Sequence, residues 1–423
     1  MIHIKHRYAA PLLAALLTMG AGTAAAQDRV VRLPERDRPL AGTPAQVFAI
    51  GRAEGAAHEM FGIVAGVAFD AAENLYVLDR QSARVMVYDR TGRFLRQIGS
   101  QGEGPGELMM PLQVVVAPDG TIIIQDLGRP AYSLFRPDGT FIRNVLMEGW
   151  MPAMSATLAW HPRGGVVGTF RQAPSETMRM GTSTRSEATI PLMFQPLSGA
   201  APTHLYNVPQ QWTVQQLAEP TGRGQGQGQR VAMRISGPPA FSPPVLFGAL
   251  STGQMALSFT PGYTIRILDA SGQTVRYLQR PTRTRLTTEA DRDRAREERR
   301  EMIASGRGGI MIRRGGGSND PPPANARQMQ ERELANMRFA DTIPALRGLR
   351  VTPSGKLWIE RTGPVVGEPG PIDLVTPEGQ YLGTITGTRL PDAISRGGLA
   401  AYVERDENDV ERVIVRRLPE SWR

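Results

Sequence analysis

Residues 99–145 read GSQGEGPGELMMPLQVVVAPDGTIIIQDLGRPAYSLFRPDGTFIRNV, and this stretch decides the fold. Val114–Val116 and Ile122–Ile124 are apolar on successive residues. Because side chains alternate between the two faces of a strand, both faces of these runs need cover. A Pro-Asp-Gly sequence at 118–120 favours a tight hairpin between the runs, and another at 137–139 favours a second hairpin. The stretch therefore predicts a four-stranded antiparallel sheet with two buried strands and two half-exposed ones.

The residues before this stretch repeat the same pattern. Leu75–Asp79 corresponds to the second buried strand, and Asp79 precedes Asp126 by 47 residues, as Gly92 precedes Gly139. A fixed period of roughly 40–50 residues with four strands in each unit is typical of a β-propeller. Less regular units are predicted near residues 160–206, 241–278, 349–385 and 398–418, which gives about six units in all.

Three features resemble a known group of propellers: the run Gly102–Leu108, the Pro-Asp-Gly turns and the aspartate that ends each second strand. They resemble the NHL-type six-bladed β-propellers, and most of all the exported bacterial "6-bladed beta-propeller" family. The resemblance is good over residues 48–145 and weaker over 262–278 and 349–385. It implies an all-β, six-bladed β-propeller. It implies no particular activity, because these motifs specify the fold.

Two segments do not follow the repeat: one precedes the propeller and the other interrupts it. Residues 27–44 are polar and are predicted as an extended lead-in to a propeller of residues 45–423, and Gln46–Gly51 resembles the last strand of a unit. Such a strand would complete the final blade and hide its edge. Residues 281–344 are predicted as a two-helix insertion between blades 4 and 5. The first helix follows a Thr288 cap and ends at Gly306, a glycine- and proline-rich bridge follows, and the second helix covers 326–339.

Residues 1–26 have the pattern of a cleaved signal peptide. Lys5 and Arg7 precede an apolar run from Ala9 to Met19, and the three alanines that end at Ala26 fit a cleavage site. The apolar run is shorter than the ~20 residues that span a bilayer, and a retained N-terminal anchor is the alternative. No other segment approaches that length, and no cysteine could carry a lipid anchor or a disulfide. We expect an exported protein, periplasmic or extracellular, with no membrane span in the mature chain.

The net charge is +9, and nearly all of the basic residues are arginine. A basic balance favours anionic partners such as nucleic acid, acidic glycans or anionic lipid. Export argues against nucleic acid, and acidic residues are interspersed among the basic ones. We expect a monomer with a protein, peptide or glycan ligand and no nucleic-acid partner.

Propeller geometry predicts where the binding site lies. The tight turns between first and second strands and between third and fourth strands lie on one face of the propeller. The links between second and third strands and the crossings between units lie on the other face. The long or irregular segments at 99–110, 146–155, 210–240 and 281–344 all fall on the second face. Surface loops of this kind carry most binding sites, so we expect the site on this face, around the central channel.

The candidate ligand-binding residues on this face are acidic, basic or aromatic: His58, Asp79, Glu103, Glu107, Asp126, Arg129, Trp150, Glu360 and Arg361. Asp79, Asp126 and Glu360 end equivalent strands, so their carboxylates could ring the channel and hold calcium. The alternative, which fits repeated positions better, is that each one caps its own loop. His58 is more simply a structural residue. Arg129, Arg361 and Trp150 are types that favour partner contacts, and for each one alone an ordinary rim residue is the simpler alternative.

The motifs assemble no catalytic set. The sequence contains no G-x-S-x-G and no H-E-x-x-H, and no helix follows the glycines of 102–106 as a phosphate-binding loop requires. We therefore favour a secreted or periplasmic binding or scaffold protein over an enzyme, with calcium as the one cofactor left open. The alternative is a metal-dependent hydrolase, lactonase or lyase with a site at the central channel, which rests on analogy between folds.

Overall fold

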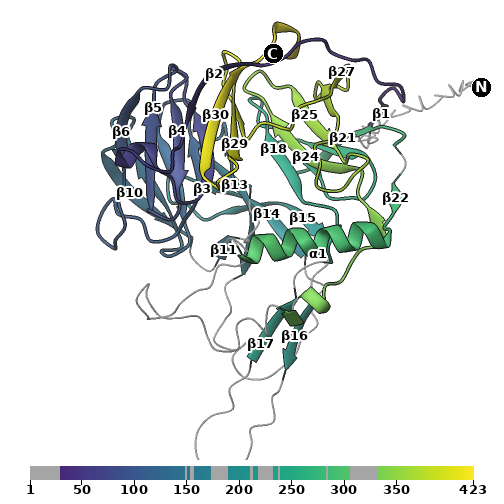
Figure 1. The fold of residues 1–423 in the computed structure, drawn as a ribbon, viewed down its shortest axis with the longest axis horizontal. Coiled ribbons are helices and arrows are strands. Elements are labelled where there is room, and N and C mark those ends of the chain that lie inside the picture. The colour runs from purple at the N-terminus through teal and green to yellow at the C-terminus, as the bar shows by residue number, and fades with distance from the viewer. Residues whose placement is uncertain are drawn as a thin grey trace, which may run out of the picture.

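The computed structural model describes residues 29–147, 150–152, 157–172, 189–209, 213–217, 232–236, 239–282, 284–304, 331–332 and 334–423. Over these residues the chain forms six antiparallel sheets, which are the blades of a six-bladed β-propeller (Figure 1). The predicted all-β propeller fold is confirmed. Two further pairs of short strands, β16–β17 and β22–β23, lie outside the blades.

Blades 1 and 2 are two copies of one pattern. Blade 1 consists of β3 (Val64–Phe69), β4 (Leu75–Asp79), β5 (Arg84–Tyr88) and β6 (Phe94–Ile98), and blade 2 of β7 (Pro111–Val116), β8 (Ile122–Asp126), β9 (Ala131–Phe135) and β10 (Phe141–Leu146). Each strand of blade 2 begins 47 residues after its counterpart in blade 1. Both first strands also shift register at the same place, before Gly66 and before Gln113.

The other blades keep this order with less regular strands. Blade 3 contains β11 (Trp150–Pro152), β12 (Ala159–His161), β13 (Gly165–Gln172), β14 (Thr189–Pro196) and β15 (Thr203–Pro209), and blade 4 contains β18 (Leu246–Ala249), β19 (Met255–Ser258), β20 (Thr264–Leu268) and β21 (Thr274–Gln279). Blade 5 contains β24 (Leu346–Val351), β25 (Leu357–Arg361), β26 (Ile372–Val375) and β27 (Tyr381–Ile385). Blade 6 contains β28 (Ala393–Ile394), β29 (Leu399–Arg405), β30 (Glu411–Arg417) and β2 (Ala45–Ile50).

The hydrophobic core lies between neighbouring blades. All three residues of Ile122–Ile124 are fully buried. Ile122 and Ile124 pack against Tyr76 and Val85 of blade 1, whereas Ile123 packs against Val166 of blade 3 and its neighbours. An unbroken apolar run is needed here because each of its two faces meets a different blade.

The N-terminal segment runs along the outer edges of three blades. β1 (Arg29–Arg32) pairs in parallel with β21 of blade 4, and Pro39 forms a parallel bridge with Thr384 of blade 5. β2 then pairs antiparallel with β30 and becomes the fourth strand of blade 6. The predicted completion of the last blade by an N-terminal strand is confirmed.

The insertion between blades 4 and 5 contains one long helix, α1 (Glu289–Ala304), framed by the pair β22 (Arg285–Leu286) and β23 (Thr342–Ile343). Thr288 caps α1 as predicted, because its Oγ1 accepts the Asp291 N–H at 3.3 Å. The second predicted helix, at 326–339, is shorter than predicted at its C-terminal end. Residues 331–332 and 334–335 form a short helical turn, and residues 326–330 lie outside the described part of the chain.

The helical turn ends before residue 338 because of a contact that is distant in sequence. Ala240 donates its N–H to the Arg338 carbonyl at 2.7 Å and accepts the Ala340 N–H at 2.8 Å. The Phe339 ring also packs against Phe241, with 5.9 Å between ring centroids. The backbone of residues 338–340 is therefore extended and cannot continue a helix.

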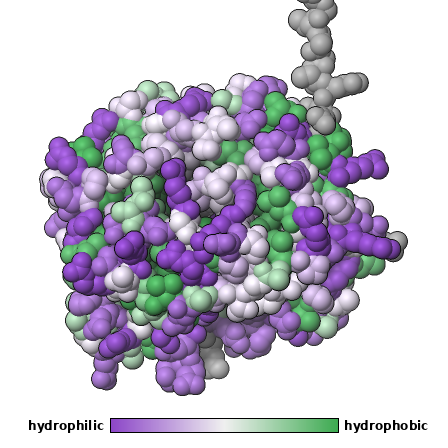
Figure 2. Space-filling view, turned by 90° about the horizontal axis from the view of Figure 1, so that it is seen from above, coloured by the Kyte–Doolittle hydropathy of each residue, from purple (hydrophilic) through white to green (hydrophobic). Residues whose placement is uncertain are grey.

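The irregular elements gather on one side of the propeller. α1, β11 and the hairpin of β16 (Thr213–Leu217) and β17 (Ala232–Ser236) lie below the blades in Figure 1. We call this side the α1 face. Figure 2 looks onto the opposite side, where hydrophilic and hydrophobic residues alternate in small patches and no broad apolar area is in view.

Several predictions fall outside the described residues. They concern the signal peptide of residues 1–26, the start of the lead-in at residues 27–28, and the bridge after α1 up to residue 330. Among the residues that the structure describes, no helix has the length and apolar character needed to cross a membrane.

Candidate functional site

Asp126, at the end of β8, holds the loop that carries the chain into blade 2. Its carboxylate is buried, with 1% of the residue exposed, and accepts the N–H groups of Met109 and Met110 at 2.8 Å each and of Gly128 at 3.0 Å. Three backbone donors saturate most of the acceptor capacity of a carboxylate. In this structure Asp126 acts as a loop cap.

Asp79 occupies the equivalent position in blade 1. It accepts the N–H groups of Ile63 at 3.3 Å and Ser82 at 3.4 Å and forms a 3.5 Å ion pair with Arg84. Arg84 also donates to the carbonyls of Ala57 and Met60, on either side of His58. The His58 ring stacks on Phe94, with 4.4 Å between centroids. His58 and Asp79 therefore belong to one local structure within blade 1.

Glu103, Glu107 and Arg129 lie at the crossing between blades 1 and 2. Glu107 accepts the N–H of Gly104 at 2.8 Å, and Arg129 donates to the carbonyl of Glu103. The Glu103 side chain is exposed. The structure thus brings these three residues together, and the hydrogen bonds of Glu107 and Arg129 are with the backbone of the same glycine-rich crossing.

Glu360 and Arg361 are adjacent in β25 and therefore point to opposite sides of blade 5. Glu360 lies on the side that faces blade 6 and is only 6% exposed. Burial raises the pKa of its carboxyl, although the charges of Arg347, Arg350 and Arg389 and a hydrogen bond from the Gly370 N–H act in the other direction.

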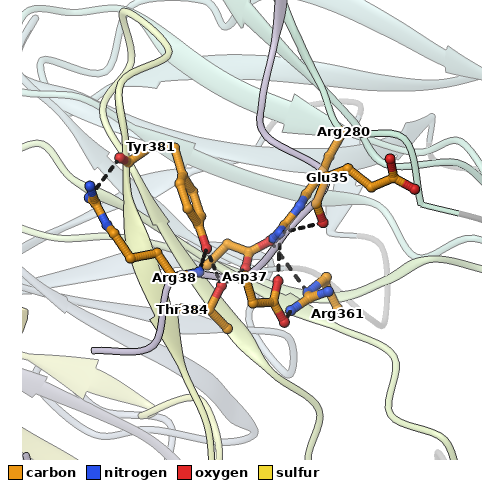
Figure 3. A network of polar contacts seen from close by, with 8 residues as sticks. Glu35, Asp37, Arg38, Arg280, Arg361, Tyr381 and Thr384 are labelled. Atoms are coloured by element: carbon orange, nitrogen blue, oxygen red, sulfur yellow. Dashed lines mark hydrogen bonds and ion pairs between the residues drawn. The ribbon is translucent and has the colours of Figure 1, made fainter. Parts of the chain in front are cut away.

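Arg361 belongs to an ionic cluster at the junction of blades 4 and 5 (Figure 3), in which Arg280 and Asp373 are buried and Asp37 is 39% exposed. It contacts Asp37 of the lead-in at 2.7 Å and Asp373 at 3.4 Å. Arg280 contacts the same two aspartates at 2.5 Å and 2.7 Å, and its side chain is 1% exposed. Burial opposes the charge of Asp37, but hydrogen bonds and charge from Arg361 and Arg280 outweigh it and lower the pKa. The cluster ties the lead-in to the propeller.

Trp150 lies in β11, whose backbone pairs with β13, and its side chain is outside the described residues. Sequence reasoning thus selected residues from blades 1, 2, 3 and 5, and the structure gathers them only in the local groups above. In the described ranges, no three histidine or acidic side chains are grouped so that they could hold a metal ion.

A cleft that sequence reasoning missed opens at the junction of blades 5 and 6. Its volume is about 480 Å³, and it is lined by Glu368, Pro369, Gly387, Thr388, Arg389, Glu404 and Arg416. We call it the blade 5–6 cleft. Glu368 and Pro369 come from the link between β25 and β26, and Gly387–Arg389 from the crossing between blades, so two of its walls are segments that propeller geometry places on the α1 face.

Two arginines dominate the chemistry of the cleft. Arg389 donates from Nη2 to Asp392 Oδ2 at 2.7 Å and to the Val403 carbonyl at 2.6 Å, whereas Arg416 makes a 3.4 Å ion pair with Glu404. Both guanidinium groups lie near the Tyr402 ring, at 5.5 Å and 4.8 Å from its centroid. Their side chains are 33% and 27% exposed, so both reach solvent in the cleft.

The outer wall of the cleft is held from two sides. Arg347 donates to the carbonyls of Gly367 at 3.2 Å and Glu368 at 2.7 Å. From α1, Arg294 donates to the Val366 carbonyl at 3.4 Å, and Glu298 packs directly on Gly367. A Cβ atom added at Gly367 would lie 2.2 Å from Glu298 Oε1. α1 therefore contacts the same link that forms the cleft wall.

One signal in the sequence pointed to this cleft. The link TGPVVGEPG between β25 and β26 is long and rich in glycine and proline, as loops with binding roles often are. No comparable sequence pattern identifies Arg389, Glu404 or Arg416. They lie in three different segments that meet only in the folded ring.

Comparisons with known proteins agree with the fold. A family model described as a 6-bladed beta-propeller, DUF5128, matches residues 61–132, which contain blade 1 and the first two strands of blade 2. The protein brain tumor of Drosophila melanogaster is 30% identical over 104 residues, which are 24% of this chain and 9% of that protein. The match thus spans a small part of that relative, and the NHL type stays a prediction.

Solved structures of similar shape differ widely in sequence. A member of the DUF4221 family from Bacteroides vulgatus is 9% identical, covers 91% of this chain and 98% of its own, and gives a TM-score of 0.51. Regucalcin from Agrobacterium tumefaciens, described as a calcium-binding protein, is 10% identical, covers 92% of this chain and 97% of its own, and gives a TM-score of 0.38. The first likeness shows the fold alone, and the second carries no argument.

Proposed function

We propose that this protein is an exported binding or scaffold protein that holds a protein, peptide or glycan ligand on its α1 face. The signal peptide of residues 1–26 would direct export, and the mature chain would act in the periplasm or outside the cell. The observation that carries the proposal is the blade 5–6 cleft. In this cleft, charged side chains from several segments converge on an open space.

The size and polarity of the cleft suit a ligand site. Ligand pockets are commonly ~300–1,000 Å³, and this cleft is about 480 Å³. Within the described part of the chain, Arg389 uses only Nη2 in hydrogen bonds, and Arg416 donates none. Planar guanidinium groups with unused donors are effective recognition groups at interfaces.

The metal-dependent enzyme remains the alternative. It requires carboxylates or histidines that converge on the channel, whereas Asp126, Asp79 and Glu107 accept N–H groups of their own loops. No observation on the described residues favours a particular reaction, so we do not assign one.

The proposal is tested by binding to two arrays, one of glycans and one of peptides, with the chain from residue 27 to 423. The test variant is Arg389→Ala with Arg416→Ala. A matched control is Arg90→Ala with Arg136→Ala, two exposed arginines in hairpins on the opposite face. We expect binding on one array that the test variant loses and the control keeps. Absence of binding on both arrays, or equal binding by both variants, would contradict the proposal.

A further inference from the structure

We propose that the blade 5–6 cleft binds a carboxylated saccharide, such as a uronate, and that α1 sets the position of its outer wall. This inference rests on the proposed function and names the ligand class. The carboxylate of the sugar lies against the guanidinium groups of Arg389 and Arg416. The hydroxyl groups of the sugar face Thr388 and the carboxylates of Glu368 and Glu404.

The two guanidinium groups account for the carboxylate. Asp392 Oδ2 and the Val403 carbonyl accept both hydrogens of Arg389 Nη2, which fixes the plane of this guanidinium group. Arg389 therefore adds its charge and single hydrogen bonds from Nε or Nη1, whereas the fork of Arg416 can match the two oxygens of a carboxylate in a bidentate pair. The Tyr402 ring beside both cations limits their movement, so little side-chain entropy is lost on binding.

The acidic side chains account for the saccharide. Glu368 and Glu404 also line the cleft, and a ligand that offered only negative charge would be repelled by them. An ionised carboxylate accepts hydrogen bonds and donates none, so the exposed Glu368 and the Arg416-paired Glu404 can each accept a sugar hydroxyl. Gly387 and Pro369 add little side-chain bulk and let a ring approach the backbone. An acidic peptide has a carboxylate but lacks the ring of hydroxyl donors.

The contacts of α1 account for the position of the wall. Glu368 lies next to Gly367, which is covered by Glu298 of α1, and Gly367 has a φ of +88° that other residues rarely adopt. Arg294 of α1 binds the Val366 carbonyl on the same link. Arg294 and Glu298 contact Val366 and Gly367, which do not line the cleft. A substitution at either residue therefore leaves the lining intact but removes a contact that holds the outer wall in place. These two residues are therefore positioning residues.

The test uses isothermal titration calorimetry of the chain from residue 27 to 423 with trigalacturonate and with its methyl ester as probes. We expect the acid to bind at least about tenfold more tightly than the ester. Arg389→Lys with Arg416→Lys keeps the charge but loses the bidentate geometry, and we expect a loss of about tenfold or more. The control Arg90→Ala with Arg136→Ala should bind like the wild type.

A second pair of variants tests the role of α1. Arg294→Ala with Glu298→Ala should weaken trigalacturonate binding several-fold, and hydrogen exchange should show faster exchange in residues 362–371. Equal binding of acid and ester, or no loss in the lysine variant, would overturn the ligand class. Unchanged binding after release of α1 would overturn its positioning role. If trigalacturonate fails while an array ligand still needs Arg389 and Arg416, this inference fails and the proposed function stands.

Discussion

At the scale of single residues, Asp126 offers a direct test of what the repeated aspartates do. Asp126→Ala removes a buried carboxylate and leaves three N–H groups, those of Met109, Met110 and Gly128, without their acceptor. We expect the free energy of unfolding to fall by about 3 kcal/mol, measured by urea denaturation. Asp79→Ala should cost less, about 1 kcal/mol, because its hydrogen bonds are long at 3.3 Å and 3.4 Å. A larger loss at Asp79 would contradict this account.

Glu360 gives a prediction about pH. Burial raises its folded pKa above the ordinary value of 4.5, so the folded state loses stability as the pH rises through the folded pKa. Glu360→Gln keeps an acceptor for the Gly370 N–H but cannot ionise. We expect the variant to gain stability relative to the wild type as the pH rises above 4.5, until Glu360 is fully ionised. Urea denaturation between pH 4 and pH 8 measures this, and a difference that stays constant would rule it out.

The carboxylates also give a prediction about metals. Because Asp79, Asp126 and Glu107 already accept N–H groups of their own loops, we expect dialysis against a chelator to leave the thermal midpoint unchanged. Added calcium should have no effect either. A midpoint that falls with chelator and recovers with one metal ion would favour the metal-dependent enzyme over the binding protein.

At the scale of elements, side-chain hydrogen bonds fix the N-terminus of α1. Arg285 binds Asp291 through two hydrogen bonds of 2.6 Å and 2.8 Å, and Asp291 accepts the N–H of Thr288 at 2.9 Å. The hydrogen bond from Arg285 is the main cause that lowers the pKa of Asp291 below 3.8. The cap is therefore fully effective above pH 3.8 and is lost only as the pH falls through the folded pKa.

We expect Asp291→Asn to destabilise α1 locally by about 1 kcal/mol, seen as faster hydrogen exchange in residues 289–304. The matched control is Asp293→Asn, whose carboxylate is 68% exposed and pairs only with Arg296 in the same helix. This control should change exchange little. Equal effects of the two substitutions would show that the cap does not anchor the helix.

The sequence predicted the elements that depend on their own residues. The period of 47 residues, the Pro-Asp-Gly hairpins and the Thr288 cap each follow from local chemistry, and the structure has all of them. The second helix was predicted to run too far because a bridge to Ala240 extends residues 338–340, and no local pattern reveals that partner. The candidate site residues stay a prediction. Strand-end carboxylates recur because the fold needs caps, whereas Arg389 and Arg416 occur once each.

At the scale of the whole molecule, the lead-in links three blades. A chain that begins at residue 45 keeps β2 but removes Asp37, which leaves Arg280 and Arg361 with Asp373 alone. We expect this chain to fold with a free energy of unfolding lower by about 1–3 kcal/mol than a chain that begins at residue 29, because the lost partner Asp37 is 39% exposed. Equal stability of the two chains in thermal and urea denaturation would contradict the role of the cluster.

Removal of residues up to 50 should have a different outcome. This chain lacks β2, so the edge of β30 is exposed, and an exposed strand edge favours association with other chains. Size-exclusion chromatography should show aggregates in place of a single monomer peak. A monomeric, cooperatively folded chain without β2 would show that ring closure does not need this strand.

The pairing of β2 with β30 also has a consequence for synthesis. Phe48 and Val415 are register partners, so nearly the entire chain must be made before they can meet. Contacts of such high sequence separation are slow to form, because a long loop must close first. The earlier blades can begin to assemble during synthesis, but the sixth blade cannot form until β30 has been made. Until then the two terminal blades of the incomplete ring stay exposed. We infer that the chain depends on chaperones until the ring closes.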